Sequence, residues 1–365
     1  MIEQRRLTIF YSPMGVNKEG KMRKMMFYVA MTVLCLLVVN PQVSLAQEKA
    51  IKIKYAHMGT PKALEDSIHG AAVAFKYVME KRSGGRFQVE IYPSGTLGKE
   101  IDLLEAVKNN VIQVHAASMA GLHRIFPAAM LPFSPYLFRN EAVAYEVIAG
   151  PAGNKLLSQF TEKTGIKGLE IIGSTYLVFT NSVRPIRTPA DMAGIKFRGM
   201  DTLQVNMFKS FGASAVPVSW PETYTSLQTG VVQGQTNPAF IVSWAKLNEV
   251  QKYLTLANSQ FGTQWMVCNK QWYDGLSPED KLIVRDAVKT ACAASIGLGV
   301  LLDDKALTEL KEKGMEITAL SDKQTLEFQK LARPACLEWL KTQMDPKLVD
   351  EFLKAIEDAE KKLGS

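Results

Sequence analysis

The sequence predicts an α/β protein of two lobes, between which the chain crosses more than once. Its 365 residues are enough for two domains, and 47% hydrophobic with 22% charged residues is typical of a chain with packed cores. Stretches with strand and helix periodicity alternate in two successive parts, which favours largely parallel sheets covered by helices. Because no repeat and no low-complexity linker separates the two parts, we expect crossovers to join a hinged pair of lobes.

Residues 1–46 have the features of a secretory signal peptide. A basic run at 21–24 precedes an almost wholly apolar stretch at 25–39, and small residues stand at positions −3 and −1 of a cleavage site after Ala46. The apolar stretch is shorter than the roughly 20 residues of a membrane-spanning helix, so an uncleaved anchor is the less favoured alternative. The sequence therefore predicts an exported, periplasmic protein, with Met22 as an alternative start of the leader.

Residues 47–172 are predicted to form mainly the first lobe. Residues 51–55 alternate apolar and polar side chains, as a half-buried strand does. Pro61 suits the first turn of the helix that follows. The expected order after the first strand is helix 61–81, strand 87–92, helix 97–109, strand 111–115, a packed crossover at 126–138, helix 142–164, and strand 166–172 leading into the second unit.

Residues 173–255 are predicted to form mainly the second lobe. The expected elements are an extended segment at 177–181, a strand at 195–197, a helix from 203 to 211, a strand at 215–218, a helix from 221 to 230, a strand from 231 and a helix at 240–250. Three strands of this lobe lead to Arg198, Trp220 and Asn237. In open α/β sheets ligands bind beyond the carboxyl ends of strands, so we expect a binding site there.

Residues 256–365 are predicted to cross between the lobes and then to form helices that pack on both. Strands at 253–258 and 264–269 are expected to cross back to the first lobe. The remaining elements are predicted as helices at 278–304, 305–313, 322–343 and 347–362, with a short strand at 315–318.

Charge and cysteine content are poor support for a nucleic-acid-binding protein or a zinc protein. The net charge is +7, but six basic and two acidic residues among the first 46 carry +4 of it, which leaves +3 for the rest. This distribution is poor support for nucleic-acid binding and weakly favours small anionic ligands. The four cysteines and four histidines show no zinc-ligand spacing. Buried free thiols are the favoured interpretation, and a single disulfide is the alternative.

Five sequence blocks carry a resemblance to a known family. They are Y-P-S-G-T-L-G-K-E-I-D-L-L-E-A-V at 92–107, L-P-F-S-P-Y-L-F at 131–138, P-A-D-M-A-G-I-K-F-R-G at 189–199, G-A-S-A-V-P-V-S-W-P-E-T-Y at 212–224 and L-Q-T-G-V-V-Q-G-Q-T-N-P at 227–238. In order and spacing they resemble the substrate-binding proteins of tripartite ATP-independent periplasmic (TRAP) transporters, most of all the four-carbon-dicarboxylate type. The resemblance implies a two-lobed, periplasmic-binding-protein-like fold that closes over a small organic acid and delivers it to a membrane permease.

The same resemblance implies a set of ligand-binding residues. Arg198 stands where the family's carboxylate-binding arginine stands, and a guanidinium binds a carboxylate bidentately. Asn237 matches a ligand-contacting asparagine, and Trp220 matches an aromatic that packs on the solute. Gln233 and Thr236 depart from the family pattern, in which acidic residues are usual. The weaker candidates are Met58, Glu100 and Ser118 in the first lobe, Tyr176 and Val178 at the rim of the second, and Gln264 near the crossover.

No catalytic motif is recognisable in the sequence. It contains no G-x-S-x-G, H-E-x-x-H, P-loop or G-x-G-x-x-G pattern, so we expect neither an enzyme nor a cofactor or metal. The expected partners are a small organic acid and the permease subunits, and the protein is expected to be a monomer. The alternatives are a receptor for an ATP-driven importer or a sensor kinase, and a periplasmic enzyme on the same scaffold.

Overall fold

The computed structural model describes residues 20, 22–29 and 50–364. The chain divides into two compact units, Met1–Lys49 and Ala50–Ser365. The described residues of the first unit are helical, whereas the predicted cleavage site lies outside the described residues. Within the described residues no helix combines the length and the apolar character that crossing a membrane requires.

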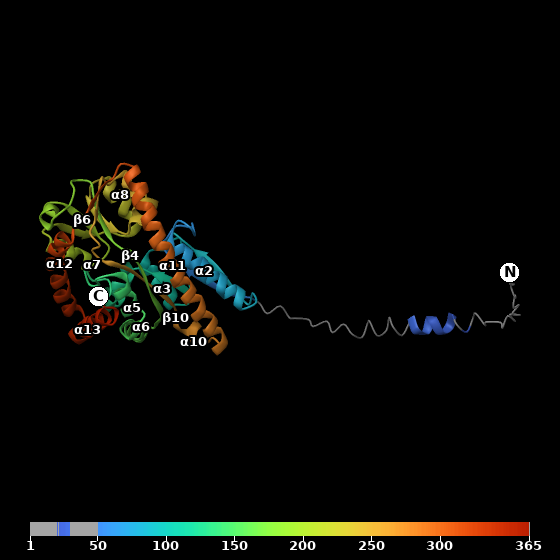
Figure 1. Cartoon of the computed structure of the whole chain (residues 1–365). Helices are drawn as coiled ribbons and strands as arrows, with labels where there is room; N and C mark the ends of the chain where they lie inside the picture. Colours follow the sequence, from blue (N-terminus) through green and yellow to red (C-terminus); the bar gives the residue numbers. More distant parts are fainter. Residues whose placement is uncertain (1–19, 21, 30–49, 365) are drawn as a thin grey trace, which may run out of the picture. The chain divides into compact units, whose positions relative to one another are not determined.

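The first lobe is built on a five-stranded sheet (Figure 1). Its strands lie in the order β2 (Phe87–Tyr92), β1 (Ile51–Ala56), β3 (Val114–Ala117), β10 (Phe261–Asn269) and β4 (Ile166–Tyr176). β1 runs parallel to β2 and β3, whereas β10 runs antiparallel to β3 and β4. The predicted strand–helix–strand order at the start of the chain therefore forms the parallel part of this sheet.

The second lobe is built on a six-stranded sheet. Its strands lie in the order β11 (Glu316–Ala319), β9 (Tyr253–Leu256), β5 (Val178–Asn181), β8 (Gly234–Asn237), β6 (Lys196–Gly199) and β7 (Ser214–Pro217). β6 runs parallel to β7 and β8, and β5 runs antiparallel to β8 and β9. The carboxyl ends of β6, β7 and β8 therefore meet at one edge of the sheet.

The chain crosses between the sheets at two strand junctions. β4 leads through Leu177 directly into β5, and residues 257–260 lead from β9 into β10. The expectation that both 253–258 and 264–269 cross back is wrong for the first of these strands, because β9 pairs with β5 and β11 in the second sheet. Strand 166–172, which lies in the range predicted mainly for the first lobe, extends to Tyr176 and pairs with β10 in the first sheet.

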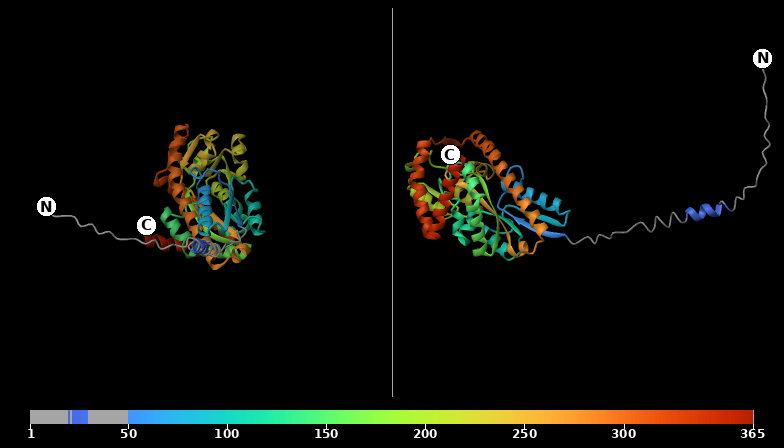
Figure 2. Two further views of the ribbon diagram at one scale, coloured as in Figure 1. Left: turned by 90° about the vertical axis from the view of Figure 1, so that its right-hand side faces the viewer. Right: turned by 60° about the horizontal axis from the view of Figure 1, so that its bottom comes forward.

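Helices cover both sheets, and the longest ones join the lobes. α11 (Pro278–Glu312) packs against α2 and β4 of the first lobe and α9 of the second (Figure 1). Figure 2 shows the C-terminal helices together, with α12 packed on α7 and α13 on α5. The helices are α2 (Ser67–Arg82), α3 (Glu100–Lys108), α4 (Met119–Ile125), α5 (Glu141–Ile148), α6 (Pro151–Thr164), α7 (Thr202–Ser210), α8 (Thr223–Gln228), α9 (Ala239–Trp244), α10 (Lys270–Asp274), α12 (Asp322–Gln343) and α13 (Pro346–Leu363). Short 3-10 turns lie at Pro127–Met130, Pro189–Met192, Trp220–Glu222 and Leu247–Glu249.

Local chemistry explains where the predicted helices differ from the observed ones. The predicted helix at 142–164 is two helices, because Pro151 disfavours a helical conformation in the preceding residue and begins α6. The predicted helix at 240–250 ends at Trp244, and Lys246 follows in a left-handed conformation with φ 55°. The two helices predicted at 278–304 and 305–313 form the single helix α11, which continues without a break across 304–305.

Candidate functional site

A cavity of about 80 Å³ lies where strand ends of the two lobes face each other. Seven of the nine predicted site residues line it: Met58, Glu100, Ser118, Arg198, Trp220, Asn237 and Gln264. Met58 and Ser118 follow β1 and β3, and Glu100 begins α3. Gln264 lies in β10, and the other three lie at or just beyond the carboxyl ends of β6, β7 and β8. Residues far apart in the sequence thus form one site between the sheets.

Arg198 is the cation of this cavity. It is only 1% exposed, and burial lowers the pKa of its guanidinium to about 10, so it remains charged at neutral pH. Its Nε donates to the carbonyl oxygen of Val218 at 3.0 Å, and its Cζ lies 6.0 Å from the ring centroid of Trp220. Its Nη1 is buried and has no hydrogen-bond partner among the described residues. A buried cation with an unpaired donor is the group that an anionic ligand would complete.

Asp201 lies close in sequence to Arg198 but does not pair with it. Its Oδ1 accepts from the backbone N–H of Gln204 at 2.8 Å and so caps α7, whereas its Oδ2 has no partner among the described residues. Burial raises the pKa of this carboxyl, and the hydrogen bond and the nearby positive charge of Arg198 oppose that rise. No ion pair with Arg198 forms within the described residues, although the Asp201 carboxyl lies near enough to interact with its charge.

Glu100 forms a pair with His115, a residue that the sequence analysis does not single out. His115 Nε2 lies 2.9 Å from Glu100 Oε2, and His115 Nδ1 lies 2.9 Å from the carbonyl oxygen of Ala56. A carbonyl oxygen only accepts, so Nδ1 carries a proton. The backbone N–H of Ser118 also donates to the Glu100 carboxyl, at 3.3 Å. His115 and Ser118 therefore hold this carboxyl in place at the wall of the cavity.

Asn237 is held by a chain of hydrogen bonds within the second sheet. Its Nδ2 donates to Gln235 Oε1, and Gln235 Nε2 donates to Thr180 Oγ1 at 2.8 Å. Thr180 Oγ1 in turn donates to Gln251 Oε1 at 3.0 Å. All of these groups are buried, so the chain satisfies them and fixes the orientation of the Asn237 amide beside the cavity.

Two tryptophans form the aromatic wall. Trp220 and Trp244 pack edge to face, with ring centroids 5.5 Å apart and an interplanar angle of 65°. Trp244 also lines the cavity, and its Nε1 is buried without a partner among the described residues. The sequence interpretation missed Trp244 because it follows the Asn237-Pro238 motif on α9 and has the ordinary spacing of a helical core residue.

Tyr176 and Val178 are not at this cavity, which corrects their assignment. The Tyr176 hydroxyl donates to the carbonyl oxygen of Phe138 at 3.3 Å, and its ring packs 5.4 Å from the centroid of Phe261. Val178 is buried in the apolar core of the second lobe. Both residues flank Leu177, where the chain crosses between the sheets. Their side chains pack within the protein and hold this crossover in place.

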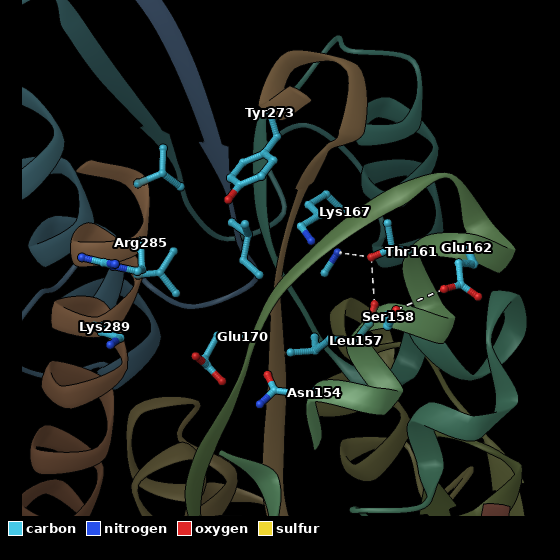
Figure 3. A pocket seen from close by; sticks show the side chains of 14 residues that line it. Asn154, Leu157, Ser158, Thr161, Glu162, Lys167, Glu170, Tyr273, Arg285 and Lys289 are labelled. Atoms are coloured by element: carbon cyan, nitrogen blue, oxygen red, sulfur yellow. Dashed lines mark hydrogen bonds between the residues drawn. The ribbon is translucent and has the colours of Figure 1, made fainter. Parts of the chain in front are cut away.

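Some other cavities lie away from the predicted residues. One of about 370 Å³ lies along β4 between α6 and α11 (Figure 3). Figure 3 shows the basic side chains Lys167, Arg285 and Lys289 and the acidic Glu162 and Glu170, which all line this cavity. Its charges are of both signs, and several of these side chains are exposed, so it lacks the single unpaired buried charge that distinguishes the cavity at Arg198.

The described residues contain no group of three or more His, Cys, Asp or Glu that could hold a metal ion. The three described cysteines, Cys268, Cys292 and Cys336, are free, and burial raises the pKa of each thiol. Neither observation adds a reactive group to the site.

Comparison with known proteins agrees with this architecture. Residues 58–343 match the family model DctP, described as bacterial extracellular solute-binding protein, family 7. The chain is 31% identical over 253 residues to the 2,3-diketo-L-gulonate-binding periplasmic protein of Escherichia coli, covering 69% of this chain and 77% of that protein. It is 30% identical over 301 residues to the C4-dicarboxylate-binding periplasmic protein of Rhodobacter capsulatus, covering 80% and 84%.

Solved structures give the same result for the fold. The sugar acid binding protein of Advenella mimigardefordensis, in complex with galactonate, matches with a TM-score of 0.80 at 28% identity, covering 85% of this chain and 99% of that one. A TRAP periplasmic solute binding protein of Polaromonas, bound to D-erythronate, matches with a TM-score of 0.77 at 27% identity, covering 84% and 98%. The predicted two-lobed α/β fold with long C-terminal helices is confirmed.

Proposed function

The chain belongs to the DctP family, the bacterial extracellular solute-binding proteins of family 7, and from this premise we propose that its cavity binds a small organic acid through Arg198. It is thus a solute receptor of the TRAP type, and the expectation that it is not an enzyme is confirmed by this membership. The observation that carries the proposal is the buried guanidinium of Arg198 at a cavity between the two sheets, whose Nη1 has no partner among the described residues.

The proposed binding reaction follows from the charges around the cavity. The guanidinium of Arg198 binds the ligand's carboxylate, Asn237 supplies a fixed amide, and Trp220 packs against the apolar part of the solute. His115 and the backbone N–H of Ser118 hold the Glu100 carboxyl at the wall of the same cavity. Closure of the lobes excludes water and so strengthens the ionic interaction.

The resemblance in the sequence blocks and the named relatives support two ligand classes for this chain. The blocks resemble the four-carbon-dicarboxylate type most, and one relative is named for that ligand. Another relative is named for a diketo-gulonate, and one structural neighbour holds galactonate, which are sugar acids. Family membership supports delivery of the ligand to a TRAP membrane permease, and we propose that the chain reaches the periplasm after cleavage of its leader following Ala46.

The proposal is tested by titrating purified protein with organic acids in a calorimeter. Arg198→Ala is expected to weaken binding by about 2–5 kcal/mol, since it removes one partner of a buried charge pair. Arg187→Ala is the matched control, because Arg187 is an exposed arginine of the same lobe that does not line the cavity. Unchanged affinity of the Arg198→Ala protein for every acid that the wild type binds would refute the assignment.

A further inference from the structure

A second cavity, of about 70 Å³, adjoins the first. The two share six lining residues: Ile68, Ser118, Met200, Asn237, Ile241 and Gln264. The second cavity extends from this shared wall towards β4, β10 and α11, where Gly173, Thr263 and Ser295 line it. A ligand whose carboxylate binds Arg198 therefore has space for its other end in the second cavity.

The charges of the two cavities are unequal. Among the described residues that line them, Arg198 is the only cationic side chain, and Glu100 is the only acidic one. The second cavity has no charged side chain in its wall, and Phe133, Leu177 and Phe240 make part of it apolar. A second carboxylate placed there would lose its hydration without gaining a cation, which is strongly unfavourable.

Unpaired polar atoms mark both ends of the combined space. Of the residues lining the two cavities, three have a buried side-chain nitrogen or oxygen without a partner among the described residues: Arg198 Nη1, Trp244 Nε1 and Thr263 Oγ1. The first two line the first cavity, and Thr263, which is 5% exposed, lines the second. Leaving a buried polar group unpaired costs about 1–3 kcal/mol, so a partner supplied by a ligand is stabilising at each end.

The backbone next to Thr263 is irregular. The pairing of β10 with β4 shifts register between Phe261 and Thr263, as at a β-bulge. Bulges re-aim side chains and are frequent next to binding sites. A Cβ at Gly262 would lie 2.9 Å from the carbonyl oxygen of Thr175, so glycine is needed for this local conformation.

We propose that the site is selective for monocarboxylates with an uncharged, hydroxyl-bearing tail, and that it discriminates against dicarboxylates. The carboxylate binds Arg198 in the first cavity, and the tail hydroxyl exchanges a hydrogen bond with Thr263 Oγ1 in the second. This assignment rests on the proposed function, because it takes the carboxylate at Arg198 as given. It selects the hydroxylated acids and rejects the four-carbon dicarboxylates that the sequence blocks resemble most.

The test compares acids of equal length that differ only at the far end. Purified protein is titrated by calorimetry with butyrate, 4-hydroxybutyrate and succinate, and then with hexanoate, 6-hydroxyhexanoate and adipate. For the better-binding length, we expect the hydroxy acid to bind most tightly and the dicarboxylate at least about tenfold more weakly than the hydroxy acid. If a dicarboxylate binds as tightly as the hydroxy acid, the selectivity is refuted while a carboxylate receptor stands.

Variants of Thr263 test the tail subsite separately. Thr263→Val removes the hydroxyl at nearly constant volume and is expected to weaken binding of the hydroxy acid about five- to tenfold, but not that of the unsubstituted acid. Thr263→Ser keeps the hydroxyl and should restore the preference. Thr290→Val is the control, since Thr290 is exposed on α11 and bonds to its own helix. Equal effects of Thr263→Val on both acids would refute the contact.

The results that would refute the proposed function differ from those that would refute the tail assignment. If no acid of either length binds, or if binding persists unchanged in Arg198→Ala, the carboxylate site at Arg198 is wrong and the tail assignment falls with it. Thermal unfolding of each variant shows whether it is folded. If the Thr263→Val protein is unstable, a folded Thr263→Ser protein still allows the binding of the hydroxy acid and the unsubstituted acid to be compared.

Discussion

Buried ionisable residues of this protein have three different kinds of surroundings. Arg198 stays charged beside a cavity, and its Nη1 has no hydrogen-bond partner among the described residues. Glu100 and His115 are in hydrogen-bond contact, and Glu100 also accepts from the backbone N–H of Ser118. His57 is fully buried and neutral, because its Nδ1 accepts from the backbone N–H of Gly59 at 3.1 Å and its Nε2 lies 3.0 Å from His69 Nδ1. Of these described residues, only Arg198 has a cationic donor without a partner.

The buried His57 is expected to make the folded protein less stable in acid. Burial, with the neighbouring His69 and His115, lowers its pKa from 6.5 to about 3. Between these values the unfolded chain binds a proton that the folded chain does not, so stability falls as the pH falls. From pH 7 to pH 5 this contributes a loss of about 2 kcal/mol in the free energy of unfolding.

Chemical denaturation of wild type and His57→Asn at the two pH values measures this effect. His57→Asn keeps an acceptor for Gly59 and does not titrate, so its stability should fall by about 2 kcal/mol less than that of the wild type. The difference between the two proteins at pH 7 serves as the reference for the substitution itself. Parallel losses in both proteins would show that His57 is not the group responsible.

At the scale of helices and strands, elements with strong local signals were predicted well. Strand 87–92 coincides with β2, and helix 322–343 coincides with α12, whose first turn is closed by a capping box between Ser321 and Gln324. β8 was misplaced at Val231 because its own residues are polar. It is fully buried nonetheless, since hydrogen bonds such as that from Gln235 to Thr180 satisfy its side chains.

Replacing glycine by alanine is expected to change the stability of the protein in opposite directions at two helical positions. A Cβ at Gly153, in the first turn of α6, would lie 1.9 Å from the carbonyl oxygen of Ile148, so Gly153→Ala should lower stability. At Gly297, inside α11, nothing lies within 4 Å, and Gly297→Ala should raise stability by about 0.5–1 kcal/mol. Urea denaturation of both variants measures this, and stabilisation of Gly153→Ala would contradict the packing at the start of α6.

At the scale of the whole molecule, the lobes are joined by several covalent and packed connections. Two strand junctions cross between the sheets, and α11 packs on helices of both lobes. Buried amides reinforce the second junction, where Gln260 Nε2 donates to the carbonyl oxygen of Phe133 at 2.7 Å and Gln204 Nε2 donates to Gln260 Oε1 at 3.0 Å. Such multiple connections restrict relative motion of the lobes to hinge-like closure.

The division of the chain at residue 49 supports a prediction about its processing. Ala50–Ser365 forms a compact unit, and the predicted cleavage after Ala46 falls just before it. N-terminal sequencing of protein recovered from the periplasm of an expressing Gram-negative cell should therefore begin at Gln47. Recovery of the uncleaved chain from the membrane fraction would favour the anchor instead.

The sequence by itself determined the fold class, the family and most of the predicted residues that line the cavity at Arg198. Apolar runs ending at Arg198, and motifs around Trp220 and Asn237, identified residues that the structure brings to one cavity. These signals are local, because a strand and the residue that follows it are neighbours in the chain.

Only the tertiary structure decided which charges at the site remain free and where its space extends. The pairing of Glu100 with His115, the absence of a cation from the described walls of the second cavity, and the unpaired hydroxyl of Thr263 all depend on contacts between distant segments. Periodicity reports which face of an element is buried but not what it is buried against. For the same reason the sequence could not separate Trp244, which lines the cavity, from Tyr176 and Val178, which do not.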